Sequence, residues 1–231
     1  MGEKFIYFAQ RNPNLKERFR PRWRRHAALA MSLPPVWDSI LKRYSQCDPV
    51  PSPPAELGVT TRYDGIGVIW LRGADAYESG QVTDAMERMQ RDEEETFSTL
   101  VHNTAFICSE TVRKPGEGLY MVFSSLKRAG GTTPEAFDAA LDAFAGALIS
   151  DPALGPKLAR LAVCKRNQLS AGGARTQDGL IEASFHTLAD AAAFYGSPAY
   201  AALARAHAAE IEETERCATR ELLLEDFELY D

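Results

Sequence analysis

The sequence predicts an α+β fold in which two ferredoxin-like β-α-β-β-α-β repeats pack sheet to sheet as a barrel within one chain. A strand–helix pattern near the start recurs in the second half, and Phe19 and Phe137 occupy matching helix positions 118 residues apart. Asp64 and Asp178, each followed by glycine and an apolar run, lie 114 residues apart. Several strands are apolar on both faces, so each needs helices on one side and a second sheet on the other.

The first repeat opens with a strand over 4–9, followed by a helix signal. Asn14 can cap the helix and Glu17 can reach back to the cap, which is the pattern of a capping box. Pro21 removes one backbone donor, so we expect either a kink or a late helix start. Residues at spacings of three and four form one apolar face: Phe19, Trp23, His26, Ala27 and Ala30.

The rest of the first repeat alternates between strand and helix signals. The segment 48–54 contains four prolines, which favours an extended loop over a core strand. The remaining elements are expected as strands over 36–46, 63–71 and 104–112, with a mostly polar helix from 75 to about 91. The predicted order is therefore strand, helix, strand, strand, helix, strand.

The second repeat shows the same order. A strand over 119–123 precedes a helix capped by Thr132 or Thr133, with Pro134 in its first turn. The apolar face of that helix consists of Phe137, Leu141, Phe144, Ala145 and Leu148. The later elements are expected as strands over 158–169, 180–185 and 219–229, and a helix from 189 to about 211 that breaks at 196–198.

Length and composition suit a globular protein of one large or two small domains, and the repeat places two domains at 1–115 and 116–231. The net charge of −6 argues against nucleic acid as the main partner. No run of eighteen apolar residues occurs, so we expect no membrane span. The cysteines are scattered without a C-x-x-C motif, which predicts neither a disulfide scaffold nor a zinc site and favours a cytoplasmic setting.

A family resemblance rests on the first repeat. After the first strand come Arg11-Asn12-Pro13 and then a helix carrying Trp23-x-x-His26-Ala27 and Leu29. With the Asp64-Gly65 strand and the acidic pair before Phe97, this pattern resembles the ethyl tert-butyl ether degradation (EthD) family. The resemblance implies a dimeric α+β barrel with a pocket between helix and sheet for a small, largely apolar molecule. Pro21, and Phe144 at the position that matches His26, depart from the family pattern.

His26 is the predicted catalytic residue. It lies on the apolar face of its helix, and an imidazole with an ordinary pKa of about 6.5 suits proton transfer near neutrality. The alternative is a core histidine whose nitrogens are satisfied by hydrogen bonds. Tyr7, Trp23 and Trp70 are candidates to line an aromatic pocket beside it, and Arg11 is a candidate to bind a ligand carboxylate or phenolate.

These residues predict a cofactor-independent enzyme that acts on a hydrophobic carbonyl, phenolic or lactone substrate, as a dehydratase, cyclase, isomerase or monooxygenase. No nucleotide-binding or serine-hydrolase motif occurs, and no histidine has the spacing of a metal ligand, so no cofactor or metal is expected. The alternatives are a non-catalytic protein that binds a small ligand or haem, and an accessory protein of a catabolic pathway. The pseudodimer can also pair again as a homodimer.

Overall fold

The structure, a computed structural model, describes residues 2–73, 84–167 and 177–226. The predicted α+β barrel is confirmed: eight antiparallel strands close into one barrel in the order β1-β3-β2-β8-β5-β7-β6-β4. The strands are β1 (Gly2–Ala9), β2 (Leu41–Pro49), β3 (Gly65–Leu71), β4 (Ala105–Lys114), β5 (Tyr120–Arg128), β6 (Arg160–Arg166), β7 (Gly179–Phe185) and β8 (Ile211–Asp226).

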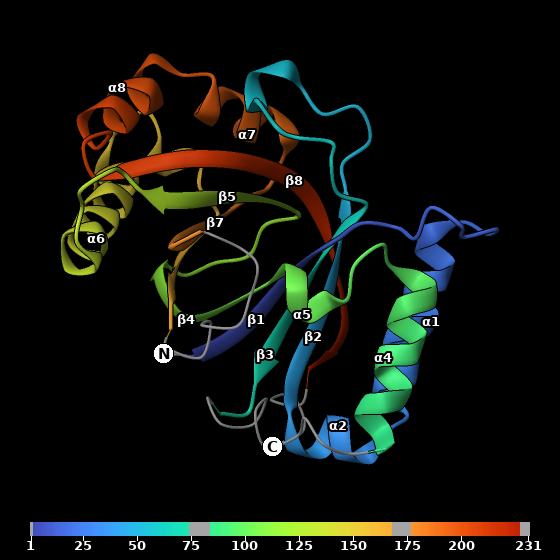
Figure 1. The fold of residues 1–231 in the computed structure, drawn as a ribbon. Helices are drawn as coiled ribbons and strands as arrows, with labels where there is room; N and C mark the ends of the chain where they lie inside the picture. Colours follow the sequence, from blue (N-terminus) through green and yellow to red (C-terminus); the bar gives the residue numbers. More distant parts are fainter. Residues whose placement is uncertain (1, 74–83, 168–176, 227–231) are drawn as a thin grey trace.

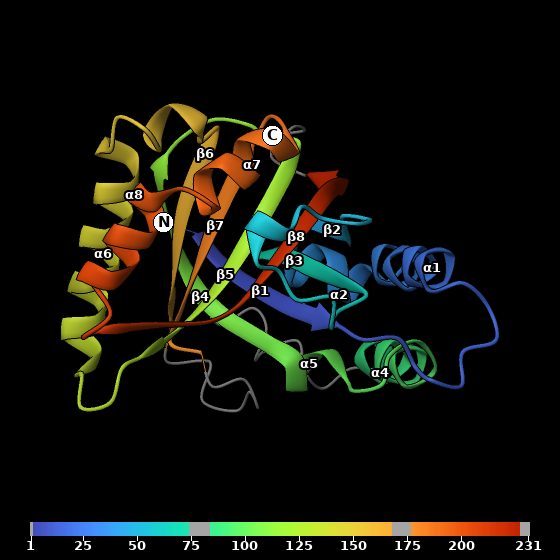
Figure 2. The same cartoon turned by 90° about the horizontal axis from the view of Figure 1, so that it is seen from above.

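Helices cover the outside of the barrel in two groups on opposite sides (Figures 1 and 2). The first group contains α1 (Phe19–Met31), α2 (Pro34–Ser39), α4 (Asp84–Thr96) and α5 (Val101–Thr104). The second group contains α6 (Pro134–Ser150), α7 (Leu188–Tyr195) and α8 (Pro198–Ala206), and two short 3-10 helices lie at η1 (Ala55–Leu57) and η2 (Gly155–Lys157). No helix in the described ranges is long and apolar enough to cross a membrane.

The two halves of the chain have the same strand order, β4-β1-β3-β2 and β8-β5-β7-β6, which is the ferredoxin-like order. The pairs β2–β8 and β4–β6 join the halves and leave the barrel without an edge. The predicted domain boundary at 115/116 falls in the connection between β4 and β5. Because β1 and β5 lie four places apart in a ring of eight, a pseudo-twofold axis runs along the barrel.

Strand register gives the positions that correspond between the halves. Ala9 pairs with Gly65 in the first half, as Leu126 pairs with Gly179 in the second. Positions on β1 therefore match positions 117 later on β5, and positions on β3 match positions 114 later on β7. This correspondence allows the chemistry of the two halves to be compared residue by residue.

The interior of the protein has three hydrophobic clusters. One fills the barrel and consists of inward-facing strand residues: Ile6, Phe8, Cys47, Ile66, Val68, Phe106, Cys108, Met121, Phe123, Cys164, Leu180 and Cys217. The others lie between the outer face of the barrel and each helix group. Strands β1, β3 and β7 therefore bury both faces over most of their length, as their two-sided apolar pattern predicts.

The first helix begins late, at Phe19, with Arg18 as its N-cap. The predicted cap at Asn14 is wrong, because Asn14 donates its backbone N–H to the Asn12 side chain in the preceding turn. Pro21 lies in the first turn, where its missing donor would have no helical acceptor in any case. The expectation of a late start, rather than a kink, is thus the correct one.

Among the other element boundaries, three differ most from the prediction. The strand expected over 36–46 begins only at Leu41, because the Pro34-Pro35 pair starts the short helix α2. The final strand begins at Ile211, where a second helix segment was expected to end, and α8 follows the predicted break. The polar helix runs over Asp84–Thr96 instead of ending near 91, and residues 74–83 lie outside the described part of the chain.

Candidate active site

An apolar cavity lies between the first helix group and the outer face of β1, β2 and β3. Its volume is about 70 Å³. It is lined by Phe5, Tyr7, His26, Ala30, Val36, Ile40, Leu41, Tyr44, Ile69, Leu71, Met86, Met89, Glu93 and Val101. We call it the helix–sheet cavity. Its walls are aliphatic and aromatic except for one imidazole, one carboxyl group and two phenols, which is the usual character of a small-molecule site.

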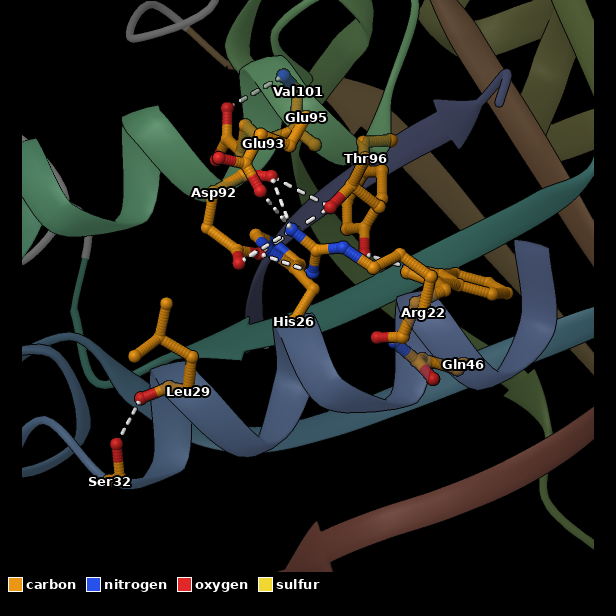
Figure 3. Close-up of polar contacts among 12 residues, drawn as sticks. Arg22, His26, Leu29, Ser32, Gln46, Asp92, Glu93, Glu95, Thr96 and Val101 are labelled. Atoms are coloured by element: carbon orange, nitrogen blue, oxygen red, sulfur yellow. Dashed lines mark hydrogen bonds and ion pairs between the residues drawn. The ribbon is translucent and has the colours of Figure 1, made fainter. Parts of the chain in front are cut away.

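His26 reaches this cavity from α1 and is only 4% exposed. Its Nδ1 lies 2.7 Å from Oδ2 of Asp92 on α4. Arg22, one turn earlier on α1, holds the same carboxylate with two guanidinium nitrogens, at 2.8 and 3.1 Å (Figure 3). Because an ionised carboxylate only accepts, Nδ1 carries the proton and Nε2 keeps its lone pair. Nε2 has no hydrogen-bond partner among the described residues, and the ring faces the cavity.

The charges of this group follow from its burial and hydrogen bonds. Burial lowers the pKa of His26 and outweighs the opposing effect of Asp92, so the imidazole is neutral at pH 7. Partial burial would raise the pKa of Asp92, but the hydrogen bonds from His26 and Arg22 hold it well below its usual range. The result is a neutral imidazole backed by a permanent carboxylate, the arrangement that fixes the tautomer of a general base.

Glu93 is the neighbour of Asp92 on α4 and also lines the cavity. Its Oε2 accepts a hydrogen bond of 3.0 Å from the backbone N–H of Val101. Burial raises the pKa of Glu93 to about 7, and the charge of Asp92 adds to this effect. The cavity therefore holds a neutral imidazole together with a carboxyl group whose pKa is about 7, and such pairs are typical of acid–base sites.

Two phenols form the polar part of the sheet wall. The hydroxyl oxygens of Tyr7 and Tyr44 are 2.5 Å apart. Trp23 donates its indole N–H to the Tyr7 oxygen at 2.8 Å, and Gln46 donates to the Tyr44 oxygen at 3.3 Å. Burial raises the pKa of Tyr44 to about 12 and that of Tyr7 well above its usual value, so both remain protonated. Their mutual bond uses one of the two hydroxyl protons and leaves one free.

Two glycines of β3 make room for these aromatic rings. A Cβ at Gly67 would lie 2.0 Å from Cε1 of Tyr7, and a Cβ at Gly65 would lie 2.3 Å from Cζ3 of Trp23. Neither position has space for any other side chain. The Asp64-Gly65 signal in the sequence therefore marks the point where the helix presses against the sheet.

The structure places the predicted site residues in three environments. Tyr7 and His26 line the cavity, and Trp23, which is fully buried, supports Tyr7 from behind. Trp70 does not lie beside His26: it faces the barrel interior, where the Lys4 ammonium approaches its ring centroid to 4.4 Å. Arg11 is exposed beyond the end of β1, and its backbone N–H donates to Asp64. The expectation that Trp70 lines an aromatic pocket beside His26 is wrong. Arg11 does not line the helix–sheet cavity, and its binding of a ligand carboxylate or phenolate stays a prediction.

Sequence reasoning missed Asp92, Glu93 and Tyr44. The acidic run near the end of the polar helix carried a signal, since a carboxylate in a buried position needs a partner. Nothing in the local pattern identified which of these acids faces inward. Tyr44 lay in a segment that was correctly expected as strand, but the face it occupies depends on the register with β3.

The fold resembles several solved structures at low sequence identity. An anthrone oxidase-like protein matches with a TM-score of 0.65 at 13% identity, over 97% of this chain and 91% of that chain. A monooxygenase candidate from Fusobacterium nucleatum matches with a TM-score of 0.58 at 6% identity, over 97% of this chain and 93% of that chain. A second monooxygenase candidate, from Lactobacillus acidophilus, matches with a TM-score of 0.55 at 8% identity, over 97% of this chain and 99% of that chain. No family model and no curated protein matches the sequence. At these identities the likeness shows the fold alone.

Proposed function

We propose that this protein is a cofactor-independent enzyme that transfers a proton on a small hydrophobic carbonyl, phenolic or lactone substrate, with His26 as the acid–base residue. The observation that carries the proposal is the lone pair of a neutral imidazole facing an apolar cavity, with Asp92 fixing its tautomer. An acid–base group placed this way commonly contributes about 10²- to 10⁴-fold to a rate.

The other polar groups fit the same reaction. His26 removes a proton from carbon or oxygen of the substrate and becomes an imidazolium that Asp92 stabilises. The free hydroxyl proton of the Tyr7–Tyr44 pair can be donated to the oxygen on which negative charge develops. Glu93, when protonated, can return a proton elsewhere on the substrate. Dehydration, cyclisation and isomerisation all begin with such a proton transfer.

Oxygenation is the version that the named neighbours support. Removing a proton from an anthrone-type phenol leaves an electron-rich anion that reduces molecular oxygen directly. For anthrone, one O₂ takes up the two hydrogens of the methylene carbon as water, and the second oxygen atom becomes the new carbonyl of anthraquinone. The solved neighbours described as an anthrone oxidase-like protein and monooxygenase candidates make this substrate class a sensible first choice. Membership of the EthD family is part of the same proposal.

The size of the cavity sets a condition on binding. An engineered cavity that holds benzene has about 150 Å³, so 70 Å³ admits only a few heavy atoms as it stands. Met86 and Met89 form part of the α4 wall, and methionine side chains adapt readily. We expect an aromatic substrate to displace these side chains.

Oxygen uptake with anthrone tests the proposal. Wild type should consume oxygen in proportion to anthraquinone formed, and His26→Gln should lose about 100-fold or more in kcat/KM while keeping its melting temperature within a few degrees. His186→Gln, which changes an exposed histidine, is the matched control and should behave as wild type. Because anthrone is one member of the class, thermal-shift screening of lactones, aromatic acids and phenols on the same variants extends the test. A ligand that stabilises wild type and His26→Gln equally, without turnover, would favour a binding protein.

The pH dependence should be bell-shaped for an acid–base pair. His26 must be unprotonated, so kcat/KM should rise through a pKa below 6.5. Glu93 must be protonated, so kcat/KM should fall through a pKa of about 7. Glu93→Gln should remove the alkaline limb and leave the acidic limb in place. A profile with the same alkaline limb in this variant would exclude Glu93 as the acid.

The alternatives make different predictions. Haem binding through His26 needs a cavity much larger than 70 Å³ and a free Nε2, and only the second condition is met in this structure. A Soret band after haem addition, lost in His26→Gln, would support it. An accessory role predicts a partner that dissociates at high salt and a cavity that binds none of the screened ligands.

A further inference from the structure

The barrel has a second, polar cavity at the end where β1 and β5 finish. Most of its lining residues are polar, unlike those of the helix–sheet cavity, and its volume is about 460 Å³. Its lining comes from both halves of the chain: Phe8, Gln10, Arg62, Tyr63, Asn103, Thr104, Lys127, Gln177, Thr214 and Glu215. We call it the barrel-mouth cavity.

Hydrogen-bond donors without partners converge on this cavity. Gln177 is only 4% exposed, and its buried side-chain amide nitrogen has no hydrogen-bond partner in the part of the chain that the structure describes. Lys127 also lines the cavity, and its ammonium makes no hydrogen bond or ion pair with the described residues. A buried amide nitrogen without a partner is costly to the fold, and such groups commonly mark a place where a ligand or water belongs.

The charge of the lining favours an anion. Arg62 and Lys127 are positive, and Glu215 is the one acidic side chain that lines the cavity among the described residues. The Tyr63 hydroxyl lies 3.0 Å from each carboxylate oxygen of Glu215, so that carboxylate is already occupied. The lining therefore carries one positive charge in excess.

The pseudo-twofold axis passes through the barrel-mouth cavity. The residues that the two halves contribute at corresponding positions of the lining are of different types. By strand register, Gln10 of the first half corresponds to Lys127, and Tyr63 corresponds to Gln177. A symmetric homodimer would present the same residue twice at each of these places. The fused chain instead has a cation and an amide donor on one side and an aromatic ring on the other.

We propose that the barrel-mouth cavity binds a small organic carboxylate. Lys127 supplies the opposing charge, and the Gln177 amide donates to a carboxylate oxygen. Phe8 and Tyr63, whose ring centroids are 5.1 Å apart, give the organic part of the ligand an aromatic wall. A single negative charge matches the single positive excess, whereas a phosphate dianion would place uncompensated charge beside Glu215.

Titration calorimetry of the full-length chain with sodium benzoate tests this site. Benzoate should bind saturably, and benzamide, which has the same shape without the charge, should bind about tenfold more weakly or worse. Lys127→Gln, which copies Gln10, should lower benzoate affinity about tenfold, and Lys16→Gln, at an exposed lysine, should not. Gln177→Met should also weaken binding without lowering the melting temperature, because it removes an amide that has no partner.

The controls separate this site from the proposed active site. His26→Phe should bind benzoate as wild type does, because His26 lines the other cavity. The proposal is overturned if benzoate shows no saturable binding, if folded Lys127→Gln keeps wild-type affinity, or if His26→Phe abolishes binding. Benzamide binding as tightly as benzoate would equally overturn it, since the recognition would then not depend on the carboxylate.

Discussion

At the residue scale, burial of Glu93 changes the pH at which this side chain ionises. Its pKa of about 7 in the folded chain lies above its ordinary value of 4.5. The unfolded chain therefore releases this proton at lower pH than the folded chain does. This contribution to stability is fully present below pH 4.5 and is lost as the pH rises through 7.

Glu93→Gln should remove this pH dependence. The amide oxygen can still accept the hydrogen bond from Val101, so the variant should match wild type near pH 4 and exceed it at pH 8 by up to about 3 kcal/mol. Urea denaturation at the two pH values measures the difference. Glu117→Gln, at an exposed acid between β4 and β5, is the control and should keep the pH dependence of wild type. Equal pH dependence in wild type and Glu93→Gln would contradict the raised pKa.

Asp92 on α4 contacts two side chains of α1, His26 and Arg22, and so contributes to the packing of the two helices. Asp92→Asn would remove the closer carboxylate from the guanidinium of Arg22, which is 7% exposed, and leave the longer contact of 3.4 Å to Glu95. We expect a loss of about 2 kcal/mol in the free energy of unfolding at pH 7, less than for a fully buried pair because Asp92 is one-fifth exposed. The pKa of His26 should fall further, because the carboxylate that favours the imidazolium is gone. Urea denaturation and NMR titration of His26 measure the two effects, and an unchanged His26 pKa would argue against the Asp92 contact.

At the scale of secondary structure, the packing of α1 on the sheet depends on glycines in β3, whose lack of a side chain leaves room for aromatic rings. Gly67 faces Tyr7 across the strand pair, whereas the second half has Ser124 opposite Ile181. The larger residue of the pair is therefore on β1 in the first half and on β7 in the second half, and in both halves it fills space between helix and sheet. This exchange is what gives the first half a phenol in its cavity.

Gly67→Ala should be strongly destabilising, by about 3 kcal/mol, because its Cβ would overlap the Tyr7 ring. In a Tyr7→Ser background, the same substitution should cost much less, because serine leaves the space open. A double-mutant cycle by urea denaturation measures this coupling. Gly146→Ala on α6 is the control: a Cβ there meets no atom within 4 Å, so stability should rise by about 0.5 to 1 kcal/mol. Additive effects at positions 7 and 67 would contradict the predicted overlap.

At the scale of the whole molecule, a buried charge cluster lies toward the opposite end of the barrel. The ammonium of Lys4, with no exposed surface, donates to Glu110 at 2.7 Å and to Glu182 at 2.7 and 3.0 Å. Burial would lower the pKa of Lys4, but Glu182 and the other nearby negative groups raise it, so the ammonium stays charged. Arg160 binds both carboxylates from β6 and so connects the two halves of the chain.

The corresponding positions in the other half are apolar: Met121 matches Lys4, and Val68 matches Glu182. Lys4→Met or Glu182→Val alone should each lower the free energy of unfolding by about 3 kcal/mol or more, since each leaves a buried charge without its partner. The double variant restores the residues of the opposite half and should cost less than either single change. Urea denaturation of the three variants tests this, and a double variant as unstable as the sum of the singles would show that the pair is not coupled.

Much of the fold was predictable because its signals are short-range. The alternation and two-sided burial of strands, the Thr133 cap of α6 and the break before Pro198 are all local properties of the chain. Boundaries failed where two local signals compete, as at Pro34-Pro35, where helix initiation overrides a strand-like run. For the candidate site, helical spacing alone placed His26 and Trp23 on the buried face of α1.

The sequence by itself determined the fold class, the pairing of corresponding elements in the two halves and the inward position of His26. Only the tertiary structure decided what His26 meets, since its partner Asp92 is 66 positions away and depends on how α4 packs on α1. It also decided that Trp70 faces the barrel interior, because a strand apolar on both faces carries no sign of which face is outward. Periodicity fixes the relative directions of neighbouring side chains, whereas the partners of those side chains depend on register and helix packing across the whole barrel.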